Sequence, residues 1–258
     1  MPTPDRDSYT VGWICAIQPE YVAAQCFLNE KHGKPESESV HINDNNHYTL
    51  GKIEEHNIVI AVLPHGEYDI SSATAIIKDM LHNFPNIRIG LMVGIGGGAP
   101  TSKHDIRLSN IVVGAPRDGS GGVIQYDFGK TNQNQNQNQN QDQNQDQNQD
   151  QGQNQGQNQG QSFQHTGFLN QPPPILRAAI TGLAARHEID GYELDEAISN
   201  VLGRKPKLQK KYKQPDPNYN RLYKSEVIHP SKKENCLTIC SDNQSKLVSR
   251  FNRTEEEG

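Results

Sequence analysis

Residues 90–100 read GLMVGIGGGAP and carry four glycines within five positions, at 94, 96, 97 and 98. Glycine lacks a Cβ atom, so a glycine cluster after a strand lets the backbone approach a ligand closely or turn tightly. Backbone amides that converge in such a loop can bind oxyanions. The segment therefore predicts a binding loop for a phosphate or a nucleotide, or else a tight turn without a ligand.

Two known glycine-rich motifs do not fit this segment. The pattern GxxxxGK[ST] of P-loop proteins is absent from the sequence. Gly94, Gly96 and Ala99 match the relaxed dinucleotide fingerprint, but that fingerprint requires a helix directly behind it. Pro100 and a further expected strand follow instead, which disfavours a Rossmann site. Two interpretations stay open: a strand-end loop whose amides bind an oxyanion or a sugar phosphate, and a plain turn.

Composition and charge restrict the class of protein. The 258 residues carry a formal net charge of −5 and are 33% hydrophobic. The chain has no overall basic field, so we expect no nucleic acid and no membrane surface as partner. No stretch reaches the roughly 18 apolar residues that cross a bilayer, and the N-terminus lacks the features of a signal peptide. We therefore expect a cytoplasmic protein.

The four cysteines do not predict a metal centre. Cys15 lies in an apparent core strand and Cys26 on the helix expected after it, so we expect buried thiols in a reducing compartment. Cys236 and Cys240 form a C-x₃-C pair, but no second ligand pair follows at zinc spacing. We expect no metal ion.

Apolar, β-branched runs alternate with helical patterns over residues 9–129. Strands are expected at 9–17, 48–53, 57–63, 87–95, 105–116 and 121–129. Helices are expected at 19–33 and at 73–84, the second with Ser71 or Ser72 as its N-cap. This alternation predicts an α/β fold.

Residues 131–161 form an Asn/Gln repeat that passes into Gln-Asp and Gln-Gly repeats. Such a tract cannot bury enough apolar surface to offset the entropy of ordering, so we expect a disordered insertion. Behind it, helices are expected at 175–187 and 193–206 and a strand at 222–229. The expected parts of the chain are a disordered N-terminus (1–8), a first domain part (9–130), the insertion (131–161), a continuation of the same domain (162–250) and a charged tail (251–258).

Several segments, taken in their order, carry a resemblance to a known family. They are VGWICAIQPE from residue 11, DNNHYTLGKIEEHNIVIAVLPHGEY from residue 44, NIRIGLMVGIGGGAP from residue 86 and GGVIQYDFGKT from residue 121. Together they resemble the purine and uridine phosphorylase superfamily. More narrowly, they resemble the fungal nucleoside phosphorylase domains at the N-terminus of NACHT, ankyrin or tetratricopeptide proteins. The resemblance implies a three-layer α/β/α fold with a central mixed sheet.

The resemblance also implies an activity. The superfamily cleaves the N-glycosidic bond of nucleosides, with phosphate or water attacking the anomeric carbon of the ribose. The expected ligand is a nucleoside, a purine rather than a pyrimidine nucleoside. No cofactor is expected, although phosphate is a candidate co-substrate, and a homo-oligomer fits the habit of the family.

Glu20, in the stretch AIQPE, is the candidate catalytic residue. It aligns with a glutamate that activates water in nucleosidases of this superfamily, where it acts as a general base or as an acceptor for the sugar. A glutamate in the first turn of a helix is also stabilised by the helix dipole without any catalytic role. Both interpretations stay open.

The remaining candidate residues bind rather than react. His65 and Gly66 lie in the LPHGEY loop, where the family holds phosphate or the 5′ region of the ribose. Tyr126 could form a wall of the base pocket. The glycine segment aligns with the loop that contacts phosphate and ribose; its residues are Gly94, Ile95, Gly96, Gly97 and Gly98. Ile95 stands where many relatives have a serine or threonine, which leaves only backbone donors for an anion.

The second half of the sequence departs from the family pattern. The Met-Glu pair that clamps the ribose hydroxyls and the acidic residue that protonates the purine have no counterpart. We therefore expect a domain that is incomplete at its C-terminus and leave turnover undecided. The alternatives are a catalytically inactive module that senses nucleosides or binds partners in a fungal NLR-type protein, and a fragment without function.

Overall fold

The computed structural model describes residues 4–33, 44–98, 100–101, 104–116, 121–123, 129–132, 162–165, 171–212, 220–229, 234, 240 and 243–250. The chain divides into two compact units, one of Met1–Leu108 with Glu193–Gly258 and the other of Ser109–Tyr192. Within the described residues, no helix is long and apolar enough to cross a membrane.

A five-stranded mixed sheet forms the centre of the first unit, with the strand order β2-β3-β4-β1-β5. Its strands are β1 (Val11–Cys15), β2 (Glu30–Lys31), β3 (Tyr48–Ile53), β4 (His56–Val62) and β5 (Ile89–Met92). β1 runs parallel to both β4 and β5, and the pairs β2–β3 and β3–β4 are antiparallel. The expected α/β class and the mixed sheet are confirmed.

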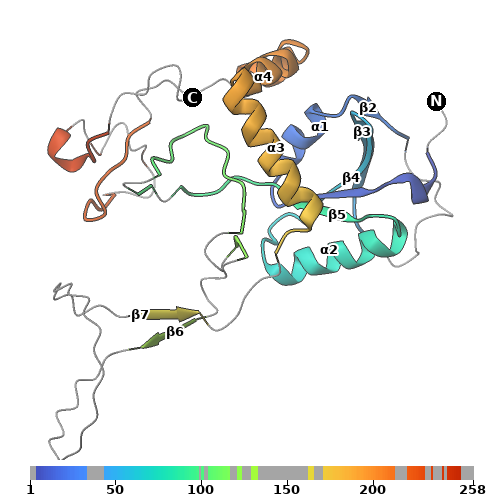
Figure 1. Cartoon of the computed structure of the whole chain (residues 1–258), viewed down its shortest axis with the longest axis horizontal. Helices are drawn as coiled ribbons and strands as arrows, with labels where there is room; N and C mark the ends of the chain where they lie inside the picture. The colour runs from blue at the N-terminus through green and yellow to red at the C-terminus, as the bar shows by residue number, and fades with distance from the viewer. Residues whose placement is uncertain are drawn as a thin grey trace, which may run out of the picture. The chain divides into compact units, whose positions relative to one another are not determined.

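Helices α1 (Gln18–Cys26) and α2 (Ile70–Asn83) cover opposite faces of this sheet (Figure 1). Successive side chains of a strand point to opposite faces, so β1 and β4 supply both sides. On the α1 side, Ala24 packs with Val11, Cys15, Ile58 and Ile60. On the α2 side, the core consists of Tyr9, Ile14, Leu50, Val59, Ala61, Leu63, Ile76, Met80 and Phe84. A helix layer on each face is consistent with a three-layer architecture.

The β3–β4 hairpin agrees with the sequence prediction. β3 has the expected bounds, and β4 begins one residue earlier than expected, at His56. Ile53 pairs with His56 across a two-residue turn. The first turn residue, Glu54, takes a positive φ of 49°, which is the backbone conformation that tight hairpins require.

Both expected N-terminal helices have different bounds in the structure. The helix expected at 19–33 ends at Cys26, because Glu30 and Lys31 pair with β3 as β2. Backbone pairing to a neighbouring strand here outweighs local helix propensity. Ser71 and Ser72 are not the N-cap of α2: the Asp69 carboxylate accepts the Ser72 amide at 2.9 Å and caps the helix.

Three predicted strands are absent, reduced to a single bridge or only partly described. Residues 104–116 and 121–123 contain no strand, whereas 124–128 lie outside the described residues. Residues 222–229 contribute only a single bridge, between Tyr223 and Leu247. The apolar, β-branched composition suggested buried strands at these places, but a strand also needs a neighbour for its hydrogen bonds.

The remaining elements lie on either side of the Asn/Gln tract. They are β6 (Gly129–Asn132), β7 (Ser162–His165), α3 (Pro174–Asp190), α4 (Leu194–Gly203) and α5 (Pro206–Lys211). β6 pairs antiparallel with β7. The helices expected at 175–187 and 193–206 are confirmed as α3 and α4, and most of the tract, 133–161, lies outside the described residues.

Candidate functional site

The loops that follow the three parallel strands meet at one edge of the sheet. β1 lies between β4 and β5, so the connection from β4 through α2 to β5 must cross over β1. Such a reversal of strand order is a topological switch point, and open α/β sheets bind ligands beside the carboxyl ends of the strands at this place. The loop after β1 leads into α1, and the loop after β5 contains the glycines.

Glu20 joins these two loops. Its Oε1 accepts a hydrogen bond from the amide of Ile95 at 2.7 Å. Its Oε2 accepts the amides of Ala16 at 2.7 Å and Ile17 at 3.1 Å. The carboxylate therefore caps the N-terminus of α1, as a glutamate at the third helical position does, and also holds the segment after β5. These bonds show the structural role of Glu20, and its catalytic role stays a prediction.

The glycine loop, Gly94–Gly98, is exposed along its length. At Gly94 an added Cβ would lie 2.7 Å from Glu20 Oε1, and at Gly98 it would lie 2.9 Å from Ile106 Cγ2. At Gly96 and Gly97 nothing lies within 4 Å of that position. The outer glycines thus permit close packing, whereas the inner two leave room for a ligand.

The other predicted residues do not converge on the carboxylate. His65 and Gly66 lie in an exposed turn after β4, where Gly66 takes a φ of 92°. Within the described part of the chain, no hydrogen bond links His65 to Glu20 or to the glycine loop. The side chain of Ile95 is 75% exposed, so this residue contributes only its amide. Tyr126 lies outside the described residues.

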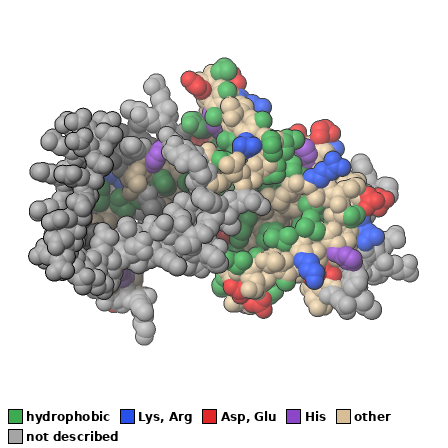
Figure 2. Space-filling view, turned by 60° about the horizontal axis from the view of Figure 1, so that its bottom comes forward, with side chains coloured by type: hydrophobic (Ala, Val, Ile, Leu, Met, Phe, Trp, Pro, Cys, Tyr) green, Lys and Arg blue, Asp and Glu red, His purple; other side chains and the backbone are tan. Residues whose placement is uncertain are grey.

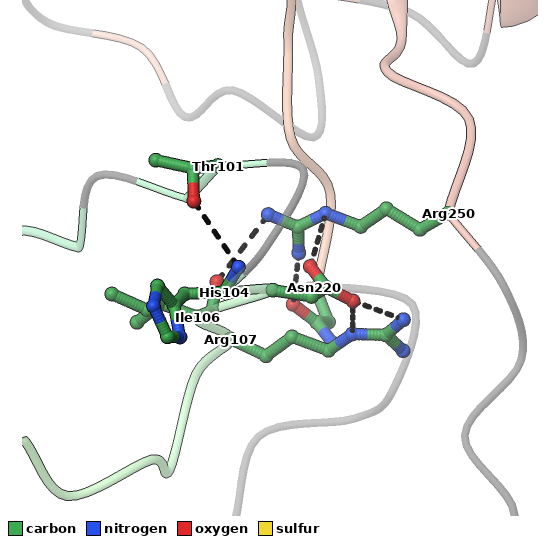
Figure 3. Close-up of polar contacts among 7 residues, drawn as sticks. Thr101, His104, Ile106, Arg107, Asn220 and Arg250 are labelled. Carbon is green, nitrogen blue, oxygen red and sulfur yellow. Dashed lines mark hydrogen bonds and ion pairs between the residues drawn. The ribbon is translucent and has the colours of Figure 1, made fainter.

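Two arginines and a carboxylate form a cluster at residues 105–107, which follow the glycine loop in the chain, together with the distant Arg250 (Figure 3). Arg107 Nε donates to Asp105 Oδ2 at 2.6 Å, and Arg250 Nε lies 3.3 Å from Asp105 Oδ1. Arg250 Nη2 also donates to the carbonyl of Ile106 at 3.4 Å, and Ile106 is the residue that Gly98 packs against. This arginine cluster (Asp105, Arg107 and Arg250) therefore ties the C-terminal segment to the continuation of the glycine loop.

The sequence pattern does not predict this cluster. Arg107 lies close to the glycine loop in the sequence, but Arg250 and Asn220, whose side chains hydrogen-bond at 3.4 Å, are more than 100 positions away from it. The arginine side chains are only 12% and 14% exposed. A buried arginine needs a carboxylate partner, and that rule would have pointed to Asp105 two residues away but not to the distant Arg250.

A hollow in the described residues lies at a different place. It has a volume of about 420 Å³ on the α2 face, beside β5. Its walls are mostly apolar, and hydrophobic side chains gather around the middle of the face drawn in Figure 2. The residues that line it are Gly12, Ile14, Ala73, Ile77, Met80, Leu81, Ile87, Arg88, Gly90, Leu91 and Met92. Glu20, His65, Gly66 and the glycine loop do not line this hollow.

The thiol of Cys15 lies close to the site but is not a nucleophile. Burial in the α1-side core, and then the charge of Glu20, raise the pKa of Cys15 from 9.0 to about 12. The thiolate is the reactive form, so Cys15 stays protonated and inert at neutral pH. Among the described residues, no group of three or more His, Cys, Asp or Glu side chains could hold a metal ion.

Comparison with known proteins finds a relative among fungal proteins. The chain is 39% identical over 196 residues to a protein of Hyaloscypha variabilis named "Nucleotide-binding leucine-rich repeat (NLR)-like protein". The match covers 76% of this chain and 17% of that protein. No family model matches the chain, and no solved structure matches it significantly. This match indicates that the chain is related to a fungal NLR-type protein. It gives no information about the chemistry of the site.

Proposed function

We propose that this chain is a nucleoside phosphorylase-like domain of an NLR-type protein, which binds a purine nucleoside and cleaves its N-glycosidic bond. The observation that carries the proposal is the contact between the Glu20 carboxylate and the Ile95 amide at the carboxyl edge of the parallel strands. The sequence resemblance predicted that these two loops act together. Their hydrogen bond supports that prediction.

The chemistry of the bond fits this arrangement. Cleavage of an N-glycosidic bond builds positive charge on the ribose, and fixed negative charge beside the sugar stabilises that transition state. Glu20 supplies a carboxylate whose position is fixed by three backbone amides. The backbone amides of Gly96 and Gly97, which lie in the exposed part of the glycine loop, would donate hydrogen bonds to the oxygen atoms of the ribose. Preorganised groups of this kind need no rearrangement during the reaction.

The compartment is also part of the proposal. Cys15, Cys26 and Cys240 are free thiols, which is usual for proteins kept in a reducing environment. We therefore propose that the domain lies in the cytoplasm, where it would have access to nucleosides.

The test is release of free base by the purified chain. Inosine, adenosine, methylthioadenosine and uridine are each incubated with the protein, with and without phosphate. We expect release from the purine nucleosides and loss of that release in Glu20→Ala, by roughly 10²-fold or more if the carboxylate acts as a general base. Glu55→Ala is the matched control, because the side chain of Glu55 is 91% exposed and pairs only with Lys52 in the described structure.

A second function is favoured by the comparison. The relative is named as an NLR-like protein, and this chain matches 17% of its length, which supports a sensing module within a larger receptor. In that case the nucleoside binds, as calorimetry would record, but no base is released. Binding that survives without release favours the sensing module, and absence of both removes the nucleoside from either proposal.

A further inference from the structure

We propose that Arg250 is a positioning residue for the nucleoside site, because it fixes the far end of the glycine loop through Ile106. The inference rests on the proposed function and adds to the site a residue that lies far from the loop in the sequence. The two ends of the loop are held by different parts of the chain. Its middle, Gly96 and Gly97, is the part that would contact the ribose.

The glycine loop is anchored at both ends and open between them. At its start, the amide of Ile95 donates to Glu20 Oε1 at 2.7 Å. At its end, Gly98 packs so closely on Ile106 that an added Cβ would lie 2.9 Å from Ile106 Cγ2. At the two glycines in between, nothing lies within 4 Å of the corresponding position. The path of the open middle therefore depends on where the two ends are held.

The backbone of Ile106 is held by a local and by a remote contact. Its amide donates to the carbonyl of His104 at 3.1 Å, within a turn in which Thr101 and His104 exchange backbone hydrogen bonds. Its carbonyl accepts a hydrogen bond from Arg250 Nη2 at 3.4 Å, across 144 positions of the sequence (Figure 3). Within the described residues, the contacts from Arg250 thus link this turn to a distant segment.

The Arg250 side chain is directed by a short antiparallel pairing, the C-terminal clip (residues 220–224 and 246–250). Tyr223 and Leu247 form its bridge, with backbone hydrogen bonds of 2.8 and 2.9 Å on either side. The same register places Asn220 opposite Arg250, and Asn220 Oδ1 accepts a hydrogen bond from Arg250 Nη1 at 3.4 Å. The clip therefore holds one edge of the guanidinium while other donors reach the turn that carries Ile106.

The chemistry of arginine suits this task. A guanidinium presents five N–H donors in a planar fork, so one side chain can contact several acceptors in fixed directions. Arg250 contacts the carboxylate of Asp105, the amide oxygen of Asn220 and the carbonyl of Ile106. Arg107 already pairs with Asp105 from two positions away. The contact with the Ile106 carbonyl is therefore the contribution that Arg250 adds to the cluster.

The first experiment needs no ligand. Backbone order parameters are measured by nitrogen-15 NMR relaxation for the wild type, Arg250→Ala, Arg250→Lys and the control Arg177→Ala, which changes an exposed arginine of α3. In both Arg250 variants, we expect the order parameter of the Gly98 amide to fall from about 0.85 to below about 0.6. The Ile95 amide should stay ordered, because its own carboxylate partner is unchanged.

Arg250→Lys keeps the positive charge of the cluster but not the planar fork, so it tests the inference even where Arg250→Ala fails to fold. A Gly98 amide that stays ordered in Arg250→Lys overturns the inference. A Gly98 amide that is already flexible in the wild type overturns it as well.

The second experiment follows nucleoside binding. Calorimetry measures the affinity for inosine of the wild type, Arg250→Lys, Ile106→Ala and the double variant, beside a melting curve for each. We expect each single substitution to weaken binding by roughly tenfold and the double variant to bind no more weakly than Ile106→Ala, because residues that act through one contact are not additive. Arg177→Ala should bind as the wild type does.

The outcomes separate the inference from the proposed function. If the wild type and Arg250→Lys bind inosine equally well, or if the two losses add in the double variant, the inference is overturned and the proposed function stands. If the wild type does not bind inosine, the proposed function is overturned, and the order parameter of Gly98 alone decides whether Arg250 positions the loop.

Discussion

The centre of the sheet and its β5 edge are made of similar residues but differ in burial. In β4, the four consecutive residues Ile58–Ala61 are buried, and both faces are covered. In β5, burial alternates between half-buried and exposed positions, and Met92 is 73% exposed. Both runs are apolar, and both were expected to be strands. The difference is that β5 has only β1 as a partner among the described strands.

The comparison teaches that an apolar run predicts a strand but not its burial. Burial depends on neighbours that are remote in the chain, here α1 and α2 on the two faces and β1 beside β4. The segment 104–116 shows the extreme case, since Ile111, Val112 and Val113 are 54–70% exposed without strand structure. Four measurements test this difference between the centre of the sheet and its β5 edge.

The largest effect is expected from truncation at the centre. Ile60→Ala removes a fully buried side chain and should lower the free energy of unfolding by about 2–5 kcal/mol. Met92→Ala is the matched change at the edge and should cost less than about 0.5 kcal/mol. Urea denaturation measures both. Equal losses would mean that β5 is as well covered as β4 and would break the contrast.

The second-largest change in stability is expected from glycine-to-alanine substitutions in the sheet. At Gly51 in β3, an added Cβ would lie 2.6 Å from the Glu30 carbonyl oxygen, which is backbone and cannot move without displacing β2. We expect Gly51→Ala to destabilise the protein by about 1–3 kcal/mol. Gly90 in β5 has nothing within 4 Å, so Gly90→Ala should be neutral or stabilising by up to about 1 kcal/mol, through the unfolded state. Thermal melting of both variants is the measurement, and a loss in Gly90→Ala would contradict the open edge.

Within the glycine loop, a crowded and an open glycine can be compared in the same way to test nucleoside binding at the site. Gly94→Ala displaces the Glu20 carboxylate and should weaken nucleoside binding by roughly tenfold or more, the equivalent of about 1.4 kcal/mol. Gly96→Ala meets open space and should leave the fold intact. Calorimetric titration with inosine, beside a melting curve for each variant, separates binding from stability. Unchanged affinity in Gly94→Ala would remove Glu20 from the binding site.

The smallest expected effect comes from the thiol of Cys15 at the centre of the sheet. It changes the unfolding free energy only at alkaline pH. Burial raises the pKa of Cys15 from 9.0 to about 12. Because the folded thiol keeps its proton while the unfolded thiol loses it, its contribution to stability is complete below pH 9 and is lost as the pH rises toward 12. Cys15→Ala should therefore flatten the fall in unfolding free energy between pH 9 and 11, relative to its own value at pH 7. A slope identical to the wild type would contradict the buried position of the thiol.

Part of the site could be predicted because its parts are local. Glu20 follows β1 by five positions, and the glycines follow β5 directly, so strand prediction alone places both at carboxyl ends. Their hydrogen bond depends on β1 lying beside β5, and no local pattern encodes this neighbour relation. Arg250 shows the same limit, because its contact with Asp105 spans most of the chain.

The sequence by itself determined the α/β class, the β3–β4 hairpin, the helices α3 and α4, and the location of the glycines, because each follows from side-chain periodicity or backbone freedom over a few residues. The tertiary structure alone decided that the helix after β1 ends early, that β5 is only half-covered, and that the carboxylate of Glu20 occupies the glycine loop. The physical reason is that hydrogen bonds and burial between remote segments outweigh local preference. These hydrogen bonds and this burial between remote segments form only after the order of the strands in the sheet is fixed.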